Sequence, residues 1–139
     1  MNLIPGISIT ASALDAEKTR MDIVGQNIAN AQTTHGADGK PYQRKLVSFE
    51  TVLQAGGGPL NPLAGSVKVA AVKNDPTPGP AVYNPQHPDA DANGMVQMPN
   101  VNLAFEMVDL ISSSRAYEAN LAVVKNAKQM AHKALSIGH

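Results

Sequence analysis

The chain contains no cysteine, so disulfide bonds, thiolate catalysis and cysteine-based zinc sites are excluded. It also lacks a net charge: 11 basic residues balance 11 acidic ones, and neither sign is concentrated in one stretch of the sequence. A nucleic-acid partner is therefore not expected, because phosphate binding leaves a basic footprint. No run of about 18 apolar residues occurs, so we expect no membrane span.

Large side chains are scarce as well, with two Phe, three Tyr and no Trp among 139 residues. The length predicts one domain, and the shortage of aromatic residues predicts a monomer of marginal stability. The first residues lack a basic segment, and Asp15 and Glu17 follow after only a short apolar run. The sequence therefore predicts no cleaved secretory signal.

A long helix is predicted from Leu103 to Leu135, a stretch without proline or glycine. Such a helix would be about 50 Å long. Apolar or small residues recur in it at alternating steps of three and four, which is typical of a coiled-coil seam. The stripe consists of Leu103, Met107, Leu110, Ser114, Tyr117, Leu121, Val124, Lys128, Ala131 and Leu135.

A second helix is predicted over residues 6–31, with Gly25 as its weak point at a cost of about 1 kcal/mol against alanine. Its stripe consists of Ile7, Ala11, Leu14, Lys18, Met21, Val24, Ile28 and Ala31. The simplest way to bury both stripes is against each other. The predicted fold is therefore mainly α, an antiparallel, coiled-coil-like pair of long N- and C-terminal helices.

Each helix also carries a second apolar stripe, which one partner helix cannot cover. The stripes are Ile9, Ala13, Ala16 and Ile23 in the first helix, and Ala116, Asn120, Val123, Ala127, Met130, Ala134 and Ile137 in the second. Because the chain offers only two helices, we expect other copies or other proteins to cover these faces.

The middle of the chain predicts a small β-rich insert between the helices. Most of the prolines and glycines lie here, and short alternating segments at 42–53, 66–73, 81–84 and 95–98 are typical of strands. Residues 54–65 are interpreted as a flexible connection. The predicted division is 1–35 for the first helix, 36–99 for the insert and loops, and 100–139 for the second helix, capped by Asn100 or Asn102 and ended by Gly138.

The segment Asp89-Ala-Asp91-Ala-Asn93-Gly94 matches the first six positions of an EF-hand calcium loop. The twelfth position should be glutamate, but here it is Asn100, and Pro85 and Pro88 prevent an entering helix. A polar turn with Gly94 at its tip is the favoured interpretation, and a calcium-binding adaptor is the alternative from another functional class. No nucleophile, acid–base pair or metal-ligand spacing indicates an enzyme, and no cofactor is expected.

Both ends of the chain resemble a known family. The segment SALDAEKTRMDIVGQNIANAQTT (12–34) resembles the N-terminal signature of bacterial flagellar axial proteins, the rod, hook and hook-junction subunits. Its most specific part is Asn27-Ile28-Ala29-Asn30-Ala31 followed by Thr33. Residues 98–138 resemble the matching C-terminal helix, and MPNVN (98–102) and SRAYEAN (114–120) are similar to proximal rod subunits in particular. The sister proximal rod protein B is the alternative within the family.

The resemblance implies a structural subunit, not an enzyme, that pairs its terminal helices in the wall of a hollow rod. The short insert favours the proximal rod, where the tube transmits torque and conducts export. Implied partners are other copies, other rod and basal-body proteins and the flagellar export apparatus, which the chain would pass without a cleaved signal to reach the periplasm-spanning rod.

Two sets of residues are the candidate contacts. The helix-packing and assembly set is Ile7, Leu14, Met21, Asn27, Ile28, Asn30, Leu103, Met107, Leu110, Tyr117, Leu121, Val124, Met130 and Leu135. The loop-contact set is Asp89, Asp91, Asn93, Pro99 and Asn100.

Overall fold

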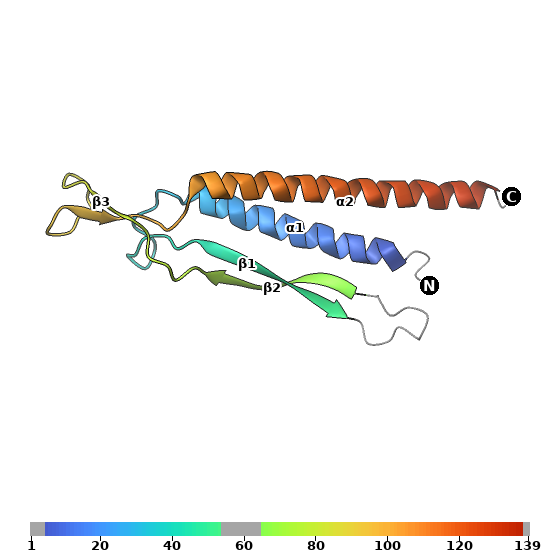
Figure 1. Ribbon diagram of the computed structural model, residues 1–139, viewed down its shortest axis with the longest axis horizontal. Coiled ribbons are helices and arrows are strands. Elements are labelled where there is room, and N and C mark those ends of the chain that lie inside the picture. Colours follow the sequence, from blue (N-terminus) through green and yellow to red (C-terminus); the bar gives the residue numbers. More distant parts are fainter. Residues whose placement is uncertain (1–4, 54–64, 138–139) are drawn as a thin grey trace. The chain divides into compact units, whose positions relative to one another are not determined.

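In the order of the sequence, a first helix is followed by four strands and then by a second helix (Figure 1). A computed structural model describes residues 5–53 and 65–137. Helix α1 runs over Pro5–Ala29 and helix α2 over Leu103–Ile137, close to the predicted ranges. Residues 54–64 of the predicted connection 54–65, and the terminating Gly138, lie outside the described residues, and residue 65 already belongs to a strand. The chain is thus mainly α with a small β insert, and no described helix is long and apolar enough to span a bilayer.

The four predicted strands are confirmed as two small sheets. Strand β1 (Lys45–Leu53) pairs with β2 (Gly65–Asn74), and β3 (Ala81–Tyr83) pairs with β4 (Met95–Gln97). The second pair is antiparallel, with Val82 opposite Val96. The first strand begins three residues later than predicted because the preceding amides bond elsewhere: Tyr42 N donates to Thr33 O, and Arg44 N to the side chain of Asn100.

The chain forms two compact units. The first comprises 1–21, 48–71 and 112–139, and we call it the basic unit because its basic residues outnumber its acidic ones. The second comprises 22–47 and 72–111, and we call it the acidic unit because the reverse holds there. Within the basic unit, Ser12 joins α1 to β2: its Oγ accepts a hydrogen bond from Val67 N at 3.1 Å and donates to Ile9 O at 2.7 Å.

Asn102 caps helix α2. Its Oδ1 accepts hydrogen bonds from Ala104 N at 3.1 Å and Phe105 N at 3.3 Å, satisfying amides that the first turn leaves without a partner. Of the two predicted caps, Asn100 instead points away from the helix and bonds to Arg44, just before β1, and to the loop after β2. Asn102 therefore caps the helix, and Asn100 fixes the segment that precedes it.

The most buried residue of α2 within the acidic unit is polar. Glu106 is fully buried, whereas the apolar residues of the same turns are exposed, among them Phe105 at 71% and Val108 at 65%. At Glu106 a polar side chain thus occupies a buried position of the kind that apolar residues usually fill on an amphipathic helix. Exposed apolar side chains continue along the whole helix: Leu103, Phe105, Met107, Val108, Ile111, Val123, Met130 and Leu135.

The predicted stripes are unevenly buried. In α2, Leu110, Tyr117, Leu121 and Val124 are half-buried, whereas Leu103, Met107, Met130 and Leu135 are exposed. In α1 the most buried apolar residues are Ala16 and Val24, and Ile7, Leu14, Met21 and Ile28 are half-buried. Ala16 belongs to the stripe that looked weaker in the sequence, because a small residue permits close approach but adds little to hydrophobic periodicity.

Two glycines provide opposite tests of the packing. An added Cβ at Gly79 would stand 2.7 Å from Pro99 C and 2.9 Å from Asn100 N, both rigid backbone atoms. At Gly25 an added Cβ would meet nothing within 4 Å outside the backbone of its own helix. We expect Gly79→Ala to destabilise the protein by about 1–3 kcal/mol through overpacking.

Gly25→Ala serves as the matched control and should stabilise the protein by about 0.5–1 kcal/mol through helix propensity. Urea unfolding monitored by circular dichroism compares the two midpoints. A Gly79→Ala midpoint equal to that of the unaltered chain would refute the close approach of the two backbone segments.

Candidate functional site

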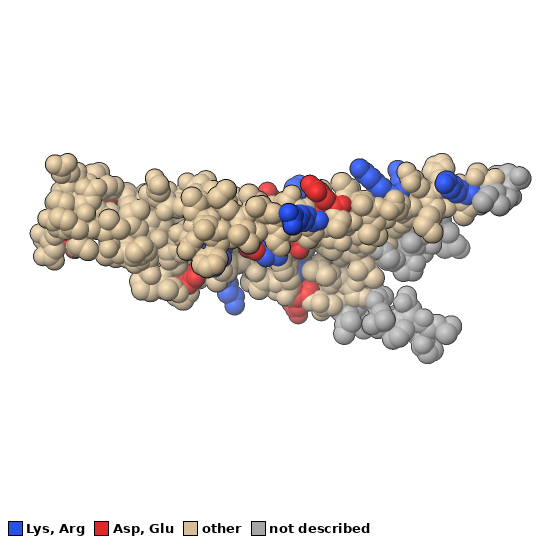
Figure 2. Space-filling view, turned by 45° about the horizontal axis from the view of Figure 1, so that its top comes forward, with Lys and Arg blue, Asp and Glu red and all other residues tan. Residues whose placement is uncertain are grey.

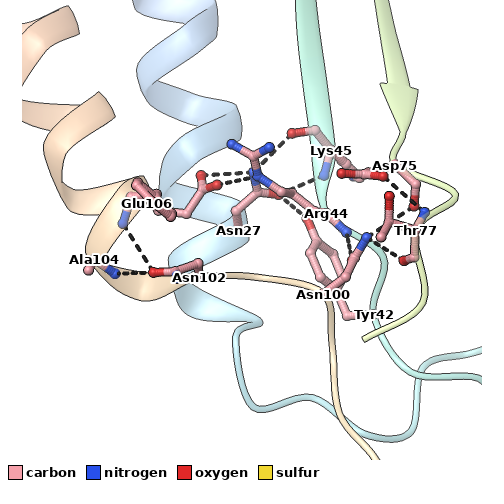
Figure 3. Close-up of polar contacts among 11 residues, drawn as sticks. Asn27, Tyr42, Arg44, Lys45, Asp75, Thr77, Asn100, Asn102, Ala104 and Glu106 are labelled. Carbon is pink, nitrogen blue, oxygen red and sulfur yellow. Dashed lines mark hydrogen bonds and ion pairs between the residues drawn. The ribbon is translucent and has the colours of Figure 1, made fainter. Parts of the chain in front are cut away.

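A buried polar junction is the main side-chain network of the acidic unit (Figure 3). At its centre is Asn27, near the end of α1 and only 1% exposed. Its Nδ2 donates to Lys45 O at 2.9 Å and to Glu106 Oε2 at 3.0 Å. Its Oδ1 accepts from Lys45 N and from the Tyr42 hydroxyl, both at 2.9 Å. All four hydrogen-bonding positions of the amide are thereby used.

Glu106 provides the negative charge of the junction. Its side chain is completely buried on the first turn of α2, and its Oε1 lies 2.5 Å from the Arg44 Nε, which donates to it. The second oxygen accepts from Asn27. A carboxylate without solvent is tolerated only when it is paired and hydrogen-bonded, and both conditions are met here. One ion pair and one amide thus join α1, the start of β1 and α2.

Asn100 extends the junction to the loop after β2. Its Oδ1 accepts from Arg44 N at 2.7 Å, and its Nδ2 donates to Asp75 O at 3.1 Å and to Thr77 O at 2.8 Å. Asp75 N in turn donates to Arg44 O at 2.7 Å. Bonds from the Thr77 side chain and backbone hold the pKa of the Asp75 carboxyl below its ordinary value, with a smaller contribution from Arg44.

Tyr42 lies at the edge of the junction, and its environment opposes ionisation. Burial raises the pKa of the phenol above its ordinary value of 10.0, and the charge of Glu106 raises it further. A neutral acid favoured by the fold contributes stability below about pH 10, which is lost as the pH rises through the folded-state pKa. Stability should therefore decline in alkali partly because Tyr42 ionises more readily in the unfolded chain.

Tyr42→Phe tests this environment. Loss of the hydroxyl leaves Asn27 Oδ1 with one partner fewer, so we expect a loss of about 0.5–1.5 kcal/mol at pH 7. Above about pH 10 the difference between the two proteins should shrink, because the variant has no phenol at this position to ionise. The unfolding midpoints of Tyr42→Phe and of the unaltered chain at pH 7 and pH 10.5 measure this difference. A constant difference at both values would show that Tyr42 titrates alike in the folded and unfolded states.

The loop between β3 and β4 is organised by its own side chains. Asp91 Oδ1 accepts from Asn93 N at 2.8 Å and Met95 N at 2.9 Å, and Gly94 adopts a φ of 73°, a left-handed conformation. Asp89 accepts from the Thr34 hydroxyl at 2.7 Å. These contacts fit the predicted polar turn, and no group of three or more potential metal-binding side chains occurs among residues 5–53 and 65–137.

The structure brings together some candidate residues and leaves others apart. Asn27 and Asn100 belong to the junction, whereas Asn30 makes local bonds to Gln26 and Thr33. Pro99 is buried beside Gly79. Arg44, Tyr42 and Glu106 were not among the candidate contact residues.

Chemically, the junction fixes structure. It consists of the Asn27 amide, the ion pair of Arg44 and Glu106 and the neutral phenol of Tyr42, and these groups hydrogen-bond to one another. The arrangement holds the end of α1 to the beginning of α2, while Phe105 and Val108 on the same turns of α2 stay exposed, which is the organisation expected of a protein that packs against others.

Comparison with known proteins agrees with a structural protein that packs against others. A family model described as "Flagella basal body rod protein" matches residues 7–37, and one described as "Flagellar basal body rod FlgEFG protein C-terminal" matches residues 92–137. The two matches cover the main parts of both helices and the segment leading into α2. The fold and these matches define a structural protein of the bacterial flagellar rod.

Full-length relatives define the family more narrowly. The chain is 41% identical over 138 residues to the flagellar basal-body rod protein FlgC of Yersinia enterocolitica and equally to that of Salmonella typhimurium, with 99% of each chain covered. It is 41% identical over 149 residues to FlgC of Bacillus subtilis, again covering 99% of both. The chain belongs to the FlgC family of flagellar basal-body rod proteins. The alternative of a calcium-binding adaptor is not favoured.

Proposed function

We propose that this chain is a building block of the proximal rod, assembling through its terminal helices into a hollow tube that transmits torque and conducts export. The observation that carries the proposal is the row of exposed apolar side chains on α2. Exposed Phe105 and Val108 surround a buried Glu106, and exposed apolar residues continue to Leu135. An apolar surface of this extent on one helix needs neighbours, and a tube of packed helices provides them.

The two helices act as an antiparallel, coiled-coil-like pair in this proposal. Its support is the direct bond from Asn27 near the end of α1 to Glu106 near the start of α2, together with half-buried Leu110, Tyr117 and Val124 at steps of seven. Residues 1–35 and 100–139 then form the rod core, and the insert at 36–99 lies outside the helix pair.

Partners and location follow from the same proposal. The chain associates with other copies of itself and with other rod and basal-body proteins. It reaches the periplasm-spanning part of the rod through the flagellar export apparatus without a cleaved signal. The loop residues Asp89, Asp91, Asn93, Pro99 and Asn100 contribute a fixed shape at the subunit boundary. Support comes from the FlgC relatives, whose names describe basal-body rod proteins.

Deletion and localisation test the proposal. A strain lacking the chain should be non-motile and form no hook, and the full chain should restore swimming. Purified basal bodies from the restored strain should contain the chain with its original N-terminus. Normal swimming in the deletion strain, or absence of the chain from purified basal bodies, would overturn the proposal.

A further inference from the structure

Folding sorts charges that are mixed along the sequence. The basic unit contains seven basic and four acidic residues, whereas the acidic unit contains four basic and seven acidic residues. The units therefore carry formal charges of +3 and −3 within a chain of zero net charge. A distribution of this kind makes two copies complementary when the basic unit of one meets the acidic unit of the next.

The positive charge is concentrated on the last turns of α2. Lys125, Lys128, His132 and Lys133 are all exposed, and no acidic residue follows Glu118 in the sequence. Their spacing puts them on one face of the helix, which we call the lysine face. Figure 2 shows blue side chains along this part of the helix without red ones beside them. Like charges at such spacing repel one another, so the fold of one copy gains little from them.

Helix length makes this face accessible. Helix α2 has 35 residues and α1 has 25, a difference of about 15 Å at 1.5 Å per residue. Every described side chain from His132 to Ser136 is exposed. The end of α2 is thus available to a neighbour with opposite charge.

We propose that the lysine face docks on the acidic unit of a neighbouring copy of this chain. The exposed acidic residues of that unit are Asp22 on α1, Asp38 in the loop after it and Asp91 in the loop between β3 and β4. A contact between two different surfaces is heterologous, and when its rotation does not close it generates an open helical array. The inference rests on the proposed rod assembly, to which it adds the pairing surfaces and their electrostatic basis.

Charge reversal tests the docking in cells. Replacing Lys125, Lys128 and Lys133 together by glutamate should lower incorporation into purified basal bodies at least tenfold. The matched control replaces the exposed Lys40, Lys68 and Lys73 by glutamate, which changes the net charge equally and should leave incorporation near normal. Incorporation by the lysine-face variant equal to that of the control would overturn the docking inference and leave the rod assignment intact.

Cysteine pairs identify the partner, because the natural chain has no cysteine to interfere. One allele carries Lys128→Cys and a differently tagged allele carries Asp22→Cys, Asp38→Cys or Asp91→Cys. Oxidation of cells expressing both should yield a mixed-tag dimer for at least one pair, and Lys73→Cys in place of Lys128→Cys should yield none. Linkage of Lys128→Cys only to a different protein, or no linkage in cells whose basal bodies contain both alleles, would refute a second copy as the occupant.

Discussion

Glu106→Ala should destabilise the protein by about 3–5 kcal/mol, the typical cost of removing one partner from a buried ion pair. The reason is that Arg44 would keep its charge in a site built for a carboxylate, and Asn27 would lose an acceptor. Because the ion pair joins the segment just before β1 to α2, swimming should be lost with the fold. Urea unfolding and a motility assay on the same variant measure both effects.

Controls separate loss of the pair from loss of a helical glutamate. Glu118→Ala removes an exposed glutamate from the same helix and should change stability by less than about 0.5 kcal/mol. The double variant with methionine at Arg44 and Glu106 should be more stable than Glu106→Ala, because no unpaired charge is left. Equal stability of Glu106→Ala and Glu118→Ala would contradict the buried ion pair.

Asn27→Asp should have an effect of similar size although the two side chains have nearly the same shape. The amide donates two hydrogen bonds, to Lys45 O and to the Glu106 carboxylate. An aspartate would face both with oxygen and place a second negative charge beside Glu106. We expect a loss of about 3 kcal/mol or more at pH 7, reduced in acid as the new carboxylate is protonated.

Asn30→Asp is the matched control one turn further along the chain. Its Nδ2 donates to Gln26 O within the same turn, so the change should cost less than about 1 kcal/mol. Thermal unfolding of both variants at pH 7 and pH 4 makes the comparison. If Asn27→Asp is as stable as Asn30→Asp at pH 7, the donors of Asn27 contribute nothing to the junction.

The helices and strands were predictable because their signals are local. Residues 103–135 contain no proline or glycine, so nothing in the local backbone interrupts a helix. Apolar and polar residues alternate around Val47 and Val67, as neighbouring side chains of a strand do. The turn at Asn93-Gly94 follows from the ability of glycine to adopt a positive φ. For the N-terminal cap of α2 the sequence left two candidates, Asn100 and Asn102. The sequence could not decide between them, because Asn100 bonds instead to Arg44, which is far away in the sequence.

The junction was not predictable because its partners are far apart in the sequence. Arg44 and Glu106 are separated by 62 residues, and Asn27 and Glu106 by 79. A glutamate in the first turn of a helix is ordinarily explained by the helix dipole, which requires no partner. The sorting of charge into two units was hidden as well, because each unit is assembled from segments that are separated in the sequence.

A density map of purified basal bodies containing this chain tests the central claim most directly. The account predicts that α1 and α2 pack antiparallel within the rod wall, that exposed Phe105, Val108 and Met130 contact neighbouring subunits, and that the insert lies outside the helix pair. A map in which these side chains face solvent, or in which the helices of one chain are separated from each other, would contradict it.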